Sequence, residues 1–235
     1  MKIWKTLTLV SLSLLGSFAV GCSKGPPLSP SESTGRERIV SLPLPSKYSE
    51  VSIEEALWKR RSIRRYAEGA LSLQEVGQLL WAAQGVTNER GFRTAPSAGA
   101  LYPLELYIVV GKVEGLSPGI YHYLPQDHAL EWVKEGDFRE LLARAALDQA
   151  WVQQAALDIV FAAIYERTTR RYGFRGVRYV HIEVGHAAEN VYLQAVSLEL
   201  GTVAVGAFHD EQVRQVLGLS EKEVPLYIMP VGRLR

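Results

Sequence analysis

Apolar and polar residues alternate with the period of an α-helix along several stretches of the chain. Ser52 and Ser72 each stand three residues before a glutamate. In this pattern the Ser hydroxyl and the Glu side chain bind the first free N–H groups of a helix. Helices are therefore predicted over residues 52–60 and 72–83.

The longest amphipathic stretch covers residues 179–200, and Gly201 is expected to end it. Its apolar residues recur at steps of three and four, so they share one face of a helix. We expect this face to lie in the core or at a subunit interface. The stripe consists of Val180, Val184, Ala187, Ala188, Val191, Ala195 and Leu198.

Runs of apolar and β-branched residues predict strands over 104–110 and 157–164. Residues 120–124 and 130–134 flank a Pro-Gln-Asp turn and read as a hairpin. Helices and strands follow one another without strict β-α-β alternation, which favours an α+β fold over a Rossmann fold. Further helices are expected at 137–146 and 211–217, and further strands at 202–207 and 226–231.

The first 22 residues have the order of a bacterial export signal. Lys2 and Lys5 precede an uncharged, apolar run, and small residues lead to Cys22. The junction 19–22 resembles a lipobox, which predicts a lipoprotein signal peptide over residues 1–22 with lipidation at Cys22. The alternatives are a plain transmembrane anchor or a signal that is cleaved elsewhere. The run is shorter than the roughly 20 residues that span a bilayer.

The composition of the rest of the chain indicates how it is divided into a tether and a domain. Residues 23–49 are rich in Pro and Ser, which predicts a tether, and a single domain is expected over 50–235. Hydrophobic residues make up 47% of the chain and charged residues 22%, which favours neither a disordered nor a polytopic membrane protein. The sole cysteine is Cys22, so intrachain disulfides and Cys-based metal sites are excluded.

The net charge of the chain and its predicted signal peptide together indicate where the protein is located and what it binds. The formal net charge of +1 gives no field that would attract nucleic acid. We expect an exported cell-envelope protein on the periplasmic or extracellular face that touches the membrane through its lipid anchor alone.

The densest polar signal is the segment 60–66, which contains Arg60, Arg61, Ser62 and Arg64. Guanidinium groups and a hydroxyl at a helix end can bind a phosphate and polarise a carbonyl oxygen. Taken alone, a segment of this kind is more often a solvated basic turn.

Glycine-containing loops supply a second kind of signal. Residues 95–103 hold small side chains between two prolines, which suits close approach of backbone N–H groups to a flat or anionic ligand. The segments 205–208 and 230–233 are strand ends where glycine permits close approach. For residues 95–103 taken alone, an ordinary loop is the more common interpretation. No His-Glu-x-x-His occurs, and no metal site is expected.

Together these pieces resemble the SagB/ThcOx-type branch of the FMN-dependent nitroreductase superfamily. The resemblance covers about residues 52–235 and implies a mixed or antiparallel central sheet flanked by helices, in an intertwined homodimer with two FMN molecules at its interface. Six motifs carry it in order: Arg-Arg-Ser-x-Arg-x-Tyr, Pro-Ser-Ala-Gly-x-x-x-Pro, Tyr-Gly-x-Arg-Gly-x-Arg-Tyr, Glu-x-Gly-His-x-x-x-Asn, Val-Gly-x-Phe and Pro-Val-Gly-Arg.

The resemblance also implies a role for individual residues. It places Arg60, Arg61 and Ser62 at the FMN ribityl phosphate and Arg64 near flavin N1 and O2, where a cation stabilises the reduced flavin. It implies that Arg233, near the end of the chain, also binds the phosphate. The partner subunit would line the ring with Pro96, Ser97, Ala98 and Gly99, while Val205 and Gly206 would contact it near N5.

One departure from the branch bears on the reaction. Azoline-oxidising members are associated with a Lys-Tyr pair that acts as a base, whereas this chain reads Arg171-Tyr172 at the corresponding place. Because arginine does not deprotonate in proteins, oxidation of azolines to thiazoles or oxazoles is disfavoured. Tyr172 and Tyr179 are the candidate acid/base groups, and Arg64 is the candidate electrostatic catalyst.

The leading functional hypothesis is an FMN-dependent oxidoreductase that transfers hydride to or from flavin N5 in a ping-pong cycle. Its substrate would be a small conjugated, quinone, nitro or peptide-derived compound, with NAD(P)H or a quinone as redox partner. The alternatives are a lipid-anchored flavin-binding protein without catalysis and an azoline-type dehydrogenase that uses oxygen.

Overall fold

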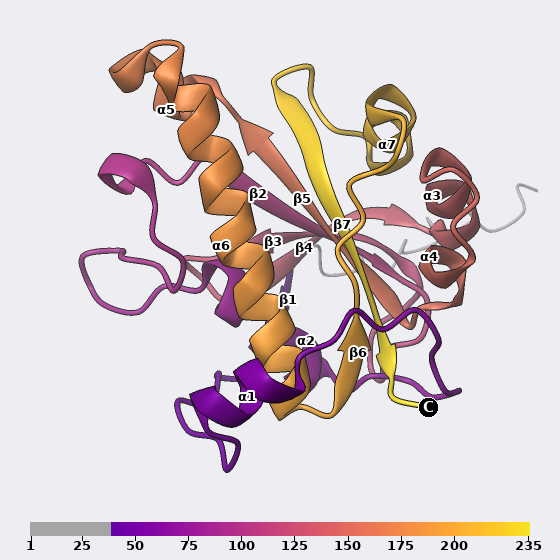
Figure 1. Ribbon diagram of the computed structural model, residues 1–235. Coiled ribbons are helices and arrows are strands. Elements are labelled where there is room, and N and C mark those ends of the chain that lie inside the picture. The colour runs from indigo at the N-terminus through magenta and orange to yellow at the C-terminus, as the bar shows by residue number, and fades with distance from the viewer. Residues whose placement is uncertain (1–38) are drawn as a thin grey trace, which may run out of the picture. The chain divides into compact units, whose positions relative to one another are not determined.

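The computed structural model describes residues 39–235. The predicted signal peptide, its Cys22 and the predicted tether up to residue 38 lie outside the described residues. Within residues 39–235, seven strands form one antiparallel sheet in the order β1-β4-β3-β2-β5-β7-β6 (Figure 1). The strands are β1 (Ile39–Ser41), β2 (Leu104–Val110), β3 (Gly119–Leu124), β4 (Ala129–Glu135), β5 (Leu157–Ile164), β6 (Leu200–Thr202) and β7 (Glu223–Arg233).

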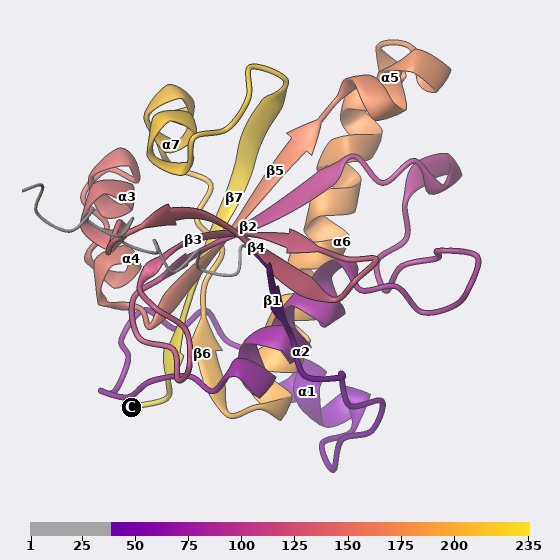
Figure 2. The same ribbon diagram turned by 180° about the vertical axis from the view of Figure 1, so that it is seen from behind.

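Helices cover both faces of this sheet (Figures 1 and 2). Helices α2 and α6 pack on one face, and α3, α4 and α7 pack on the other. The predicted α+β fold with an antiparallel sheet flanked by helices is therefore confirmed. The helices are α1 (Ile53–Lys59), α2 (Leu73–Gln84), the 3-10 turn η1 (Ala98–Ala100), α3 (Arg139–Ala145), α4 (Ala150–Gln154), α5 (Glu166–Tyr172), α6 (Arg175–Ser197) and α7 (Asp210–Leu217).

Strand β2 shows why two helical layers are needed. Side chains alternate between the faces of a strand, and here both sets are apolar. Leu106 and Ile108 join the core beneath α2 and α6, while Tyr107 and Val109 join the core beneath α3, α4 and α7. A central strand that is apolar on both faces has to be covered twice.

Helix α6 is the longest element, with 23 residues and an axis of about 35 Å. Its predicted apolar stripe is confirmed: Val180, Val191 and Ala187 are fully buried against α2 and the sheet. Among residues 39–235, no helix is long and apolar enough to cross a membrane.

The helix starts predicted from serine caps are also present. Ser72 and Glu75 form a complete capping box at α2. At α1 the Ser52 hydroxyl accepts from the Glu55 N–H, while the Glu55 carboxylate bonds Lys59 instead.

Several predicted boundaries were wrong. Helix α6 begins at Arg175 and ends at Ser197, and Gly201 lies in β6 instead of ending the helix. The strand predicted over 202–207 is reduced to Thr202 and an isolated bridge between Val205 and Ile228. Helices α4 and α5 were not predicted, because each is a short segment without a distinct apolar period.

The sheet begins before residue 50, where the domain was predicted to start. Strand β1 pairs with β4 within the range expected to be tether. Leu42 is buried in the core, and the Ser46 N–H donates to the Gln78 side chain. The proline-rich composition of this segment concealed a strand of only three residues.

Candidate functional site

The arginine-rich segment that follows α1 is fixed across one end of the sheet. The Ile63 N–H donates to the Thr202 carbonyl at 2.9 Å, and the Ala67 N–H donates to the Arg233 carbonyl at 3.0 Å. Two glycines permit this contact. A Cβ on Gly201 would lie 2.7 Å from Ile63 Cγ2, and one on Gly232 would lie 2.6 Å from Tyr66 Cγ. At Gly232, where glycine was expected to permit close approach, the approaching group is the Tyr66 side chain of the same chain.

Tyr192 on α6 connects two of the predicted FMN-binding segments. Its hydroxyl lies 3.2 Å from Ser62 Oγ and accepts a 2.7 Å hydrogen bond from the Ala204 N–H. The Arg60 guanidinium lies over its ring, 5.2 Å from the centroid. Residues 60–62 and the segment that leads into Val205 and Gly206 therefore meet at one buried side chain.

The cations of this segment differ in their surroundings. Arg60 is half-buried, and its Nε lies 4.0 Å from the nearest oxygen of Glu189. Arg61 turns back to the Trp58 and Arg60 carbonyls. Arg64 is exposed, lies 5.6 Å from the centroid of the Trp151 ring, and forms no ion pair within residues 39–235. Arg60, Arg64 and the Ser62 hydroxyl are chemically suited to a phosphate and an electron-rich ring.

Arg233 has a different environment from the one that the resemblance implies. Its guanidinium forms a two-pronged ion pair with Glu75 and donates twice to the Ala70 carbonyl. Burial acts to raise the pKa of Glu75, but the bonds from Arg233 and Ser72 hold it below its usual value. These bonds use four of the donor positions of Arg233, so the side chain joins β7 to the start of α2 instead of projecting toward a phosphate.

The loop that contains Pro96, Ser97, Ala98 and Gly99 contacts a different part of α6 from the part that contacts the arginine-rich segment. Ser97 Oγ donates to Glu183 at 2.5 Å and accepts from the Tyr102 N–H at 2.9 Å. Glu183 and the Tyr192 that contacts Ser62 are nine residues apart, which is about 13 Å along the helix axis. Within one chain, the structure does not bring this loop together with the arginine-rich segment.

Tyr172 and Tyr179 lie near that loop. Their rings meet edge to face at 5.2 Å between centroids. Gly99 has a φ of +65°, and a Cβ there would lie 2.7 Å from the Tyr172 hydroxyl and 3.0 Å from an Arg171 nitrogen. The Arg171-Tyr172 pair is therefore adjacent to the loop predicted to line the flavin.

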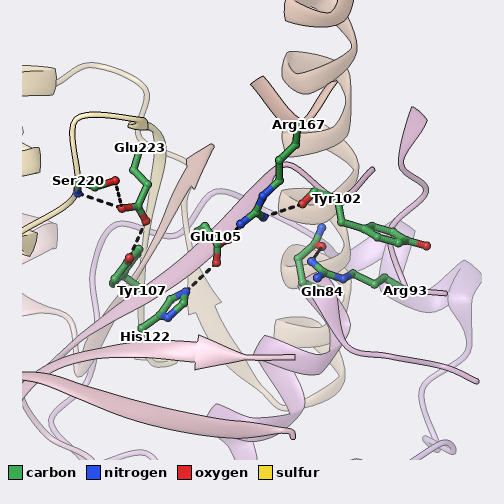
Figure 3. Close-up of polar contacts among 9 residues, drawn as sticks. All are labelled: Gln84, Arg93, Tyr102, Glu105, Tyr107, His122, Arg167, Ser220 and Glu223. Carbon is green, nitrogen blue, oxygen red and sulfur yellow. Dashed lines mark hydrogen bonds and ion pairs between the residues drawn. The ribbon is translucent and has the colours of Figure 1, made fainter. Parts of the chain in front are cut away.

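A polar network fixes the position of α5, which carries this pair (Figure 3). Arg167 forms an ion pair with Glu105 on β2 and donates to the Tyr102 carbonyl at 3.0 Å. His122 on β3 bonds the other oxygen of Glu105 at 2.8 Å. Burial acts to raise the pKa of Glu105, but His122 and Arg167 together hold it below its usual value.

The network continues on the other side of His122. Its ring stacks on Tyr107 at 4.6 Å between centroids, and the Tyr107 hydroxyl donates to the buried Glu223 at 2.6 Å. Ser220 donates to the second oxygen of Glu223 (Figure 3). Burial, followed by the bond to Glu223, raises the pKa of Tyr107.

The sequence reasoning missed the groups that hold the predicted residues in place. Tyr192 was missed because one tyrosine in a long amphipathic helix has no distinctive pattern. Glu105 does carry a signal, since an acidic residue stands within an otherwise apolar strand. Glu183 is the glutamate of the Glu-x-Gly-His-x-x-x-Asn motif, which by itself implies no role for it. His186 is exposed, and the Asn190 amide donates to the Ala82 carbonyl of α2.

The fold and this site define an α+β protein with a cationic, glycine-lined sheet edge. Residues 57–233 match the nitroreductase family. A nitroreductase homologue of Methanocaldococcus jannaschii is 52% identical over 184 residues, which are 78% of this chain and 92% of that protein. The chain belongs to the nitroreductase family. Family members generally bind FMN, and the family supports an oxidoreductase role.

Two further relatives agree with this assignment. A nitroreductase-family crystal structure from Ralstonia eutropha JMP134 is 32% identical, has a TM-score of 0.74, and is similar over 85% of this chain and 90% of that chain. The microcin B17-processing protein of Escherichia coli is 29% identical over 146 residues, or 60% of this chain. The chain matches 54% of that protein's length, and the similarity supports the predicted superfamily.

Proposed function

We propose that the chain is an FMN-dependent oxidoreductase of the SagB type that works by a ping-pong cycle. The observation that carries the proposal is the meeting of Arg60, Ser62 and the backbone at Ala204 around Tyr192. These groups are far apart in the sequence, and an interaction with a shared ligand gives a reason for their assembly.

Different residues of the chain would bind different parts of FMN. Arg60 and Ser62 would hold the FMN phosphate, and Val205 and Gly206 would meet the ring edge. FMN, when bound, supplies hydride transfer at N5. Arg64 would place a positive charge near N1 and O2, which favours the reduced state. Its lack of an ion pair within residues 39–235 leaves that charge available. The bonds of Arg233 to Glu75 support a positioning role.

A small conjugated, quinone or nitro acceptor is the proposed substrate class, with NAD(P)H or a quinone as redox partner. The Arg171-Tyr172 pair beside Gly99 supports this choice. Arginine cannot act as the base that azoline oxidation needs, but the Tyr172 hydroxyl can donate a proton to a reduced acceptor.

A homodimer is proposed because one chain leaves its two flavin-binding segments apart. Pro96 to Gly99 would then reach the flavin of the second subunit. Exposed apolar side chains support association: Trp58 on α1 is 81% exposed and Phe174 next to α6 is 92% exposed. Sedimentation at micromolar concentration should give a dimer, and a monomer that binds FMN fully would contradict it.

Anchoring at the cell envelope is a separate proposal that rests on residues 1–22. Labelling with a radioactive fatty acid in cells should modify the wild-type chain and spare Cys22→Ser. Equal labelling of both would reject the anchor without bearing on the flavin site.

The test of function compares two arginine variants with a surface control. Arg60→Ala should weaken FMN binding by roughly 10- to 100-fold, because a hydrogen bond to a charged group is lost. Arg64→Ala should lower the two-electron reduction potential of bound FMN by roughly 30 to 60 mV, and Arg64→Lys should largely restore it. Arg90→Ala, in an exposed loop, should change neither. Wild-type protein that binds no FMN would refute the proposal.

A further inference from the structure

Glu183 is a buried carboxyl that the proposed chemistry does not use. It lies on α6, its side chain is 2% exposed, and one oxygen accepts from Ser97 Oγ at 2.5 Å. Its other oxygen has no hydrogen-bond partner among residues 39–235. Ser97 Oγ also accepts from the Tyr102 N–H, and it donates its single hydrogen to Glu183.

The surroundings of Glu183 bring its titration close to neutral pH. Burial raises its pKa to about 7, and the bond from Ser97 and the charge of Arg93 oppose this rise only in part. Arg93 donates to Gln84 of α2 and stacks on Tyr102 at 4.6 Å. The negative charge of Glu105 on β2 acts to raise the pKa of Arg93, whereas the positive charge of Arg167 on α5 acts to lower it.

Protonation of Glu183 changes what the Ser97 hydroxyl can do. When Glu183 is ionised, it has no hydrogen to donate, and Ser97 must donate to it. When Glu183 is neutral, its own O–H can donate to Ser97 Oγ. Ser97 still accepts from the Tyr102 N–H, and its hydrogen becomes free for another acceptor. This step is a protonation only: Glu183 takes one proton from solvent, and no other covalent bond forms or breaks.

We propose that Glu183 is a positioning residue whose proton directs the Ser97 hydroxyl either to Glu183 or to an acceptor on the bound cofactor. The inference rests on the proposed function, in which Ser97 lines the FMN ring. Ser97 and Glu183 belong to the same chain, so the pair acts as a unit whichever subunit's flavin it faces. FMN should bind more tightly when Glu183 is neutral.

The test measures the dissociation constant of FMN by fluorescence quenching between about pH 5.5 and about pH 8.5, on either side of the carboxyl's titration. Wild type should bind about fivefold more tightly at the acid end, which is the effect of one added hydrogen bond. Glu183→Gln should stay near the acid value throughout, because its amide donates to Ser97 at every pH. Ser97→Ala should show no step, and the exposed Glu221→Gln should behave as wild type.

A second measurement needs no FMN. Infrared difference spectra of the full chain should show a protonated carboxyl that disappears near pH 7 in wild type and is absent from Glu183→Gln. An equal pH step in wild type and Glu183→Gln, or a step that persists in Ser97→Ala, would overturn this inference while leaving FMN binding intact. Wild type that binds no FMN at any pH would overturn the proposed function and this inference with it.

Discussion

Substitution of Gly232 by alanine tests how the arginine-rich segment is positioned. An added Cβ would lie 2.6 Å from Tyr66 Cγ and 2.8 Å from Tyr66 Cβ, whereas ordinary contacts are 3.4 to 4 Å. The Tyr66 ring cannot easily move away, because its hydroxyl donates to the Ile63 and Pro230 carbonyls at 3.1 and 3.2 Å. The clash therefore has to be relieved by the backbone of the segment.

The expected cost follows from these distances. Restoring ordinary contact requires a shift of about 1 Å, and overpacking of this kind costs about 1 to 3 kcal/mol. The shift would also displace Arg60, Ser62 and Arg64, and a site that is loose by about 1 Å binds poorly. Gly232→Ala should therefore lower the free energy of unfolding by about 2 kcal/mol and weaken FMN binding by roughly tenfold.

Urea unfolding and FMN titration of the same preparations measure both effects. Gly77→Ala is the matched control, because Gly77 is also buried but its Cβ would meet nothing closer than 3.4 Å. Alanine is favoured over glycine within a helix by about 0.5 to 1 kcal/mol, so Gly77→Ala should not be less stable than wild type. If Gly232→Ala is as stable as Gly77→Ala and binds FMN normally, the close packing of Tyr66 on β7 does not position the site.

Three further predictions concern buried polar groups. Because the pKa of Glu183 is raised from 4.5 to about 7, Glu183 should contribute about 3 kcal/mol to the free energy of unfolding near pH 4.5, and most of this is lost as pH rises to about 7. Over this range Glu183→Gln should lose about 3 kcal/mol less than wild type in urea unfolding, and an equal fall in both would contradict the assignment. Tyr192→Phe leaves the Ala204 N–H without its acceptor, so it should cost about 1 to 2 kcal/mol and weaken FMN binding; unchanged binding would separate Tyr192 from the site. Burial raises the pKa of Asp158, whose oxygens have no hydrogen-bond partner within residues 39–235, so Asp158→Asn should raise the thermal midpoint more at alkaline than at acid pH. A uniform shift across pH would show that Asp158 does not titrate on unfolding.

Patterns that act within a few residues could be predicted from the sequence. The caps at Ser52 and Ser72, the apolar stripe of α6 and the strands at 104–110 and 157–164 all follow from local spacing. Helix α5 was not predicted, because it is short and has no apolar period, and it is held in place by the ion pair of Arg167 with Glu105, about sixty residues away. A contact of that kind leaves no periodic signal in either segment.

The candidate site was predictable in its chemistry and less so in its geometry. The motifs made Ser62 and Arg64 candidates, but the meeting point at Tyr192 depends on the packing of α6 beside β6. Arg233 was assigned to a phosphate because its motif matched, and its pairing with Glu75 could not be read from either segment alone. Gly201 was expected to end a helix, whereas it lies in β6, where its lack of a Cβ leaves room for the Ile63 side chain.

The most direct test of the central claim is the ligand that copurifies with the chain expressed without its predicted signal peptide. Absorbance and mass spectrometry of that ligand, followed by titration of the ligand-free protein with FMN, measure identity and stoichiometry together. The account predicts an oxidised-flavin spectrum, the mass of FMN and one FMN for each chain. A colourless protein that binds no FMN on reconstitution would contradict it.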